Sequence, residues 1–133
     1  MRILVAYVSA LAAFVALDFV WLSVMVQRLY RPELGEILAS KPRPAAAVAF
    51  YLFYAIGLVF LAVAPALKEG AAGRAALNGL VLGAVAYATY DLTNQATLRT
   101  WSMRVSIADI AWGACATALA AVAAFAVTRA IAR

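Results

Sequence analysis

The sequence predicts an all-α membrane protein, a bundle of four transmembrane helices. The 133 residues are 68% apolar and only 13% charged, whereas soluble domains are usually about 45–50% apolar and about 25% charged. Four apolar stretches lie at about 3–26, 45–67, 75–97 and 107–128. Each is close to the ~20 residues that cross a ~30 Å hydrocarbon core as a helix. We therefore expect one integral membrane domain over residues 1–133, without a soluble domain.

The connection between the first two apolar stretches is polar and runs from Arg28 to Pro44. Pro32 suits the first turn of a helix, and Glu33 suits the positive end of its dipole. These features indicate a short interfacial helix. Gly35 weakens this interpretation, so a solvated loop is the alternative at this position.

The expected topology places both chain termini at one membrane face and the polar connections 27–44 and 95–106 at the other. Lys and Arg outnumber Asp and Glu by 11 to 6, which suits contact with anionic lipid headgroups. Membrane lipids are therefore expected partners, whereas nucleic acid is not, because little extramembrane surface remains. The basic residues divide about evenly between the two faces, so they do not orient the protein.

The most polar part of the apolar stretches runs from Tyr87 to Asn94 and reads Y-A-T-Y-D-L-T-N. Phenols, a carboxyl and an amide follow each other where hydrocarbon is the expected neighbour, so the protein must satisfy them internally. Gly79 and Gly83 precede them on a small-residue helix face. Steps of four residues continue that face to Tyr87 and Asp91, so we expect Asp91 to face a neighbouring helix.

Three acidic residues lie within the apolar stretches: Asp18, Asp91 and Asp109. The topology places all three in the same half of the bilayer. An Asp at the centre of a membrane helix costs roughly 2.5–3.5 kcal/mol and is a functional candidate by default. Asp18 is the deepest, at about eight residues or ~12 Å from its helix end. Asp109 lies near a helix start, where a carboxylate that only complements the dipole is an equal alternative.

These acids are expected to form an intramembrane polar cavity with aromatic walls, which binds a lipid or other amphipathic small molecule. The candidate ligand-binding residues are Asp18, Trp21, Tyr87, Tyr90, Asp91, Asn94, Asp109 and Trp112. The acids and the amide would bind the polar end, and the rings would form the walls. Tyr51 and Tyr54 in the second stretch are either interfacial belt residues or additional lining.

Several chemistries are excluded because the chain has no histidine. They include histidine-ligated haem, histidine-based zinc sites and Ser-His-Asp catalysis. The three acids and Asn94 could offer oxygen ligands to a hard cation, but their spacing fits no metal motif, so no metal or cofactor is expected. An arginine that reached Asp91 or Asp109 would make the acids structural.

Two further function classes stay open beside lipid binding. One is a proton-coupled transport subunit in which Asp18 and Asp91 exchange protons, and the other is a structural or assembly protein whose polar residues lock helices together. The half of the bundle nearest the termini is almost purely Ala, Val, Leu and Gly, which favours a dead-end cavity over a channel. Whether the protein is an enzyme, and whether it forms a homo-oligomer, is left open by the sequence.

Three motifs resemble those of a known family. They occur in the order Asp18-Phe-Val-Trp-Leu22, Tyr90-Asp-Leu-Thr-Asn94 and Asp109-Ile-Ala-Trp-Gly113. The chain resembles, over essentially its whole length, a family of small bacterial membrane proteins catalogued as a domain of unknown function. The resemblance implies four transmembrane helices, a multi-pass location in the bacterial inner membrane and gene neighbourhoods of lipid-modifying enzymes. It implies no established activity.

Overall fold

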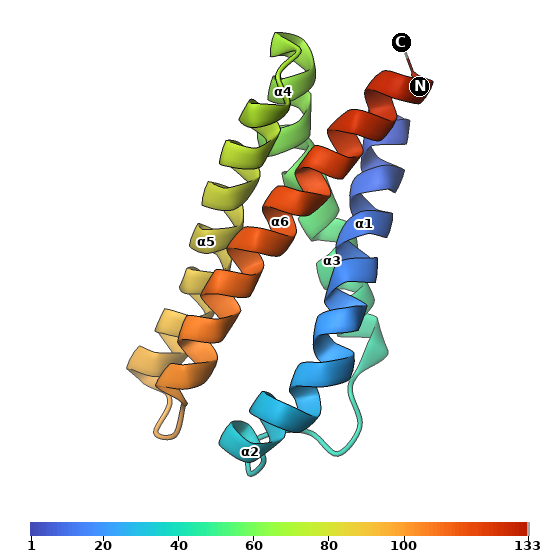
Figure 1. Ribbon diagram of the computed structural model, residues 1–133. Helices are drawn as coiled ribbons and strands as arrows, with labels where there is room; N and C mark the ends of the chain where they lie inside the picture. The colour runs from blue at the N-terminus through green and yellow to red at the C-terminus, as the bar shows by residue number, and fades with distance from the viewer. Residues whose placement is uncertain (133) are drawn as a thin grey trace.

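Four helical segments make up the protein (Figure 1). A computed structural model describes residues 1–132. The first helical segment consists of α1 (Arg2–Met25), the π-helical turn η1 (Val26–Tyr30) and α2 (Arg31–Leu34). The second consists of α3 (Pro44–Leu58), the π-helical turn η2 (Val59–Val63) and α4 (Ala64–Glu69). The third is α5 (Ala72–Thr97), and the fourth is α6 (Met103–Ile131). All regular structure in the described residues is helical, which confirms the all-α part of the predicted fold class.

Three of these helices are long and apolar enough to cross a membrane. Within the described residues they are Arg2–Leu34, Pro44–Glu69 and Met103–Ile131, of 33, 26 and 29 residues. They contain three of the four predicted spans. α5 contains the remaining predicted span and has 26 residues, about 39 Å at 1.5 Å per residue, but it is less apolar. Crossing by α5 therefore stays a prediction.

The connection after the first helix contains less helix than the sequence predicted. Pro32 does lie in the first turn of α2, but α2 has only 4 residues and continues the first helix directly. Leu34 is buried, whereas Ile37 and Leu38 are exposed. No regular element follows until α3 begins at Pro44. Whether this segment lies in a membrane interface stays a prediction.

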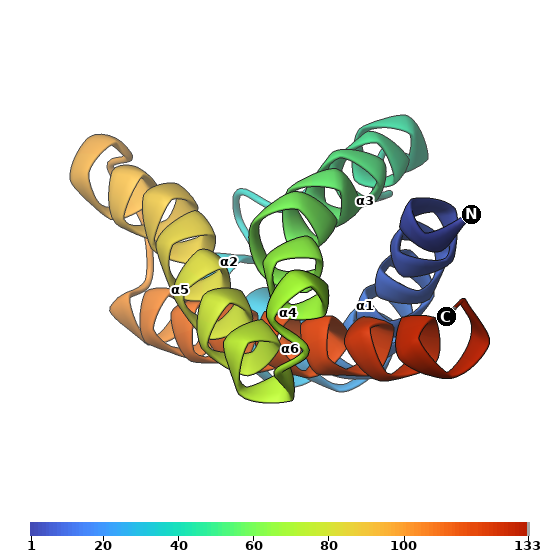
Figure 2. The same cartoon turned by 90° about the horizontal axis from the view of Figure 1, so that it is seen from above.

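α6 is the central helix of the arrangement, with α1 and α5 packed beside it (Figure 2). The second helix contacts α5 mainly through η2 and α4. Its first part, α3, packs on α1 and diverges from α5. Both termini lie at one end of the bundle, and α2 and the connection between α5 and α6 lie at the other, as predicted (Figure 1). That these two ends lie at opposite membrane faces stays a prediction.

The contact between α5 and α6 depends on the predicted small-residue face. A Cβ atom on Gly83 would lie 2.1 Å from the carbonyl oxygen of Gly113, and one on Gly79 would lie 2.9 Å from the Cα atom of Ala118. The two backbones therefore touch directly, as small-residue helix faces allow. Further along the same face, Asp91 is completely buried, which confirms that it faces a neighbouring helix.

Candidate functional site

A cavity of about 430 Å³ lies between the four helices, in the half of the bundle nearest α2. It is lined by Asp18, Trp21, Leu22, Tyr30, Phe50, Tyr54, Ala86, Tyr87, Tyr90, Asp109 and Trp112. Six of the eight predicted site residues are in this set. Asp91 and Asn94 are the two that are not.

Asp18 joins three helices at one wall of the cavity. The indole Nε1 of Trp112 donates a hydrogen bond to Asp18 Oδ1 at 3.1 Å, and the hydroxyl of Tyr51 donates to Asp18 Oδ2. The Asp18 side chain is 7% exposed. A buried polar group needs such partners, and here α3 and α6 supply them without a basic residue.

Asp109 is held in a similar way by the first helix. The hydroxyl of Tyr30 donates to Asp109 Oδ1, and Nε1 of Trp21 donates to the Tyr30 oxygen at 3.0 Å. Asp109 is also 7% exposed. The rings of Trp21 and Trp112 stack with centroids 4.6 Å apart and planes 8° apart, so the hydrogen bonds of the two acids are linked through one aromatic pair.

Asp91 lies outside the cavity wall, between α5 and α6. Neither of its carboxyl oxygens makes a hydrogen bond within the described part of the chain. Ser106 Oγ, on α6, lies 3.5 Å from the Asp91 carbonyl oxygen, which fixes the level of Asp91 along α6. Asp91 therefore lies in the contact between α5 and α6 without a polar partner for its carboxyl group among residues 1–132.

No arginine of the described residues forms an ion pair with Asp18, Asp91 or Asp109. In residues 1–132 the ion pairs are Arg104 with Glu33 at 3.3 Å and Arg74 with Glu69 at 3.0 Å. Over the same residues, no three acidic or cysteine side chains converge as metal ligands would. Asp18 and Asp109 are therefore held by phenol and indole donors, whereas Asp91 is buried in the contact between α5 and α6.

Three tyrosines at the site were missed or left undecided by the sequence analysis. Tyr54 lines the cavity, and its hydroxyl lies 2.7 Å from Thr117 Oγ1, while Tyr51 binds Asp18. Both therefore face the bundle interior. Tyr30 was assigned to the polar connection. On a regular helix it would lie about 120° away from Asp18, but the π-helical turn η1 changes that angle, and no residue type in the sequence marks the turn.

The cavity opens sideways between α3 and α5. Phe50 on α3 and Tyr90 on α5 both line it, yet their side chains are 43% and 59% exposed. These two helices diverge at this level (Figure 2). A molecule outside the bundle could therefore reach the buried acids by passing between them.

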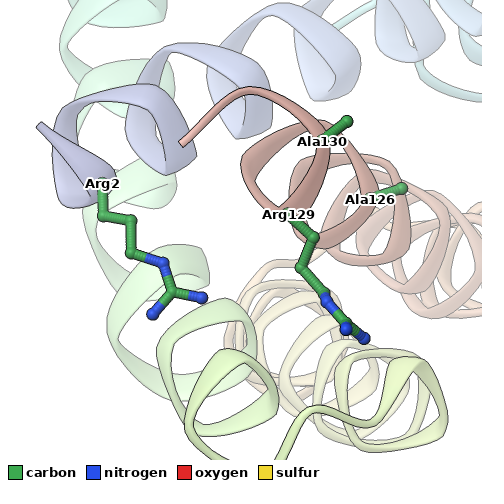
Figure 3. A pocket seen from close by; sticks show the side chains of 4 residues that line it. All are labelled: Arg2, Ala126, Arg129 and Ala130. Atoms are coloured by element: carbon green, nitrogen blue, oxygen red, sulfur yellow. The ribbon is translucent and has the colours of Figure 1, made fainter. Parts of the chain in front are cut away.

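A second hollow, of about 740 Å³, lies at the end of the bundle that carries the termini. Arg2 and Arg129 line it together with Ala126 and Ala130 (Figure 3). Arg129 donates a hydrogen bond to the carbonyl oxygen of Gly70 at 3.3 Å. The two hollows thus carry opposite charges, with basic residues at this end and buried acids near α2.

Comparison with known proteins identifies the family. The model of a family described as "Predicted membrane protein (DUF2177)" matches residues 3–126. No curated protein and no solved structure matches the chain. The matched range contains all the residues that line the cavity and the three sequence motifs, which confirms the resemblance to a family of unknown function. The chain belongs to the DUF2177 family of predicted membrane proteins.

Proposed function

We propose that this protein crosses the bacterial inner membrane four times and binds an amphipathic small molecule, such as a lipid, in the cavity between its helices. The polar end would lie against Asp18 and Asp109, and the apolar tail would leave between α3 and α5. The observation that carries the proposal is a cavity with buried acids inside and a sideways opening. Lipid modification is the context that the family resemblance suggests.

The fourth crossing is supported by how α5 packs. α5 and α6 touch at Gly79 and Gly83, near the middle of α5, and again where Asp91 meets Ser106. A bilayer that surrounds α6 would therefore also surround α5. The carboxyl group of Asp91 would be shielded from the hydrocarbon because Asp91 faces α6.

The size and depth of the cavity suit one polar headgroup. Ligand sites usually occupy about 300–1,000 Å³, and this cavity occupies about 430 Å³. Phe50 lies about 9 Å along α3 from Pro44, and Tyr90 lies about 10 Å from the end of α5 at Thr97. The opening would then lie within the hydrocarbon region, where an acyl tail can remain in the bilayer.

The test fills the cavity from one wall. Ala86 lines the cavity at the middle of α5, whereas the neighbouring Val85 is 59% exposed on the outer surface. Ala86→Trp should lower the amount of copurifying amphiphile, measured by mass spectrometry, about tenfold or more. Val85→Trp adds the same ring outside and should leave that amount unchanged. Equal retention by both variants, with unfolding temperatures close to the parent, would contradict the proposal.

A proton-coupled transport subunit is the second candidate. The burial of Asp91 and Asp109 in the bundle favours it, because carboxyl groups inside membrane proteins often form proton relays. Transport would additionally need a polar route to the other end of the bundle.

A further inference from the structure

We infer that the polar end bound in the cavity is an ammonium group, so that the ligand class is a cationic-headed amphiphile, either an alkylamine or a lipid with an amine or quaternary ammonium headgroup. This inference rests on the proposed amphiphile-binding function. It names the charge of the headgroup, which the proposed function leaves open.

The charges around the cavity favour a cation. Asp18 and Asp109 are its acidic lining residues, and no Lys or Arg among residues 1–132 lines it. The nearest candidate counter-charge in sequence, Arg104, is bonded to Glu33 and has an 80% exposed side chain. An anionic headgroup would meet like charges in surroundings of low dielectric, where repulsion is strong. A cation would instead neutralise them.

Four hydrogen-bond donors around the two acids are already used. The indole of Trp112 and the hydroxyl of Tyr51 donate to Asp18, and the hydroxyl of Tyr30 donates to Asp109. The indole of Trp21 donates to Tyr30. The carboxyl groups keep spare acceptor capacity for a ligand. A phosphate or a carboxylate would need donors there, whereas an ammonium group needs acceptors or no hydrogen bonds.

The walls of the cavity supply the other requirement of an ammonium site. Aromatic rings present a negative face to a cation, and cages of such rings recognise quaternary ammonium groups. The stacked pair Trp21 and Trp112 lies beside both acids. The rings of Tyr54 and Tyr87 meet edge to face with centroids 6.3 Å apart and line the same cavity. Acids and ring faces therefore surround one space.

The experiment compares headgroups on one tail. Binding to the protein in dodecyl maltoside micelles is followed by tryptophan fluorescence, because two of the three tryptophans line the cavity. The probes are dodecylammonium, dodecylphosphocholine, dodecyl phosphate and dodecanol. Dodecylammonium should bind about tenfold or more tightly than dodecyl phosphate and dodecanol. Equal binding of dodecylphosphocholine would assign the ammonium to a lipid headgroup, and weaker binding would assign it to a simple amine.

Variants separate the cavity acids from general surface charge. Asp18→Asn and, independently, Asp109→Asn should weaken dodecylammonium binding about tenfold. Glu36→Gln is the matched control, because Glu36 is an exposed acid near α2 outside the cavity; it should leave binding unchanged.

Two outcomes would overturn the inference in distinguishable ways. If dodecanol or dodecyl phosphate binds as tightly as dodecylammonium, and Ala86→Trp abolishes that binding, the ammonium assignment is wrong while the amphiphile site stands. If Ala86→Trp changes the binding of no probe, the proposed function itself is wrong.

Discussion

Replacing Asp18 with asparagine tests whether this carboxyl group serves binding more than folding. The asparagine would keep the size of the side chain, accept from Trp112 with its oxygen and donate to the Tyr51 hydroxyl with its amide. Each of the two hydrogen bonds would become weaker by about 1 kcal/mol, because the side chain at position 18 would no longer be charged. Removing a charge from a membrane helix offsets this by roughly 2.5–3.5 kcal/mol. We expect the free energy of unfolding to rise by about 0.5–1.5 kcal/mol.

Asp18→Ala is the comparison that isolates the hydrogen bonds, because it also removes the charge but leaves Trp112 and Tyr51 without an acceptor. Each buried unpaired donor costs about 1–3 kcal/mol, so Asp18→Ala, with two such donors, should be about 2–6 kcal/mol less stable than Asp18→Asn. Unfolding in mixed micelles, followed by circular dichroism, measures both, and mass spectrometry measures the copurifying amphiphile. Asp18→Asn should lose the amphiphile. If it is as unstable as Asp18→Ala and keeps its ligand, the carboxyl group is structural.

Further predictions concern the helix packing and the topology. Gly83→Ala should destabilise the fold by about 1–3 kcal/mol, because its Cβ atom would lie 2.1 Å from the backbone of α6. Gly57→Ala, with no atom within 4 Å, should stabilise it by about 0.5–1 kcal/mol; equal unfolding temperatures would contradict the close contact. The topology is tested by single cysteines in a background without the exposed Cys115. Gly73→Cys and Thr100→Cys should react with a membrane-impermeant maleimide from opposite sides of the membrane. If both react from the same side, α5 does not cross the membrane.

Most of the fold could be predicted from the sequence because it depends on properties that are local. Apolar length sets the helices, and the spacing of Gly79 and Gly83 marks the face on which α5 packs. The two π-helical turns, η1 and η2, could not be predicted. A π-helical turn shifts the backbone hydrogen bonds by one residue, and no residue type signals the shift, yet η1 changes where Tyr30 points.

The site was predicted in part for the same reason. Asp18, Trp21 and Trp112 follow from helix periodicity and topology. Asp91 shares the predicted face, but α5 and α6 touch so closely at Gly83 that Asp91 is buried between them and does not border the cavity. Whether Tyr54 forms a lipid belt or lines a site depends on the angle at which α3 leaves its neighbours, and periodicity carries no information on that angle.

The packing beyond the cavity bears on the choice between binding and transport. The next polar contact toward the termini is that of Tyr54 with Thr117. Past this level the buried residues of the described bundle are apolar, among them Leu58, Val63 and a series of alanines on α6, as far as Thr128. The Thr128 hydroxyl already donates to the carbonyl oxygen of Ala124. A proton leaving Asp109 or Asp18 would have to cross this apolar layer without a hydrogen-bonded carrier, and a headgroup would not fit through close-packed alanines. The packing therefore favours a cavity that is entered and left by the same opening between α3 and α5.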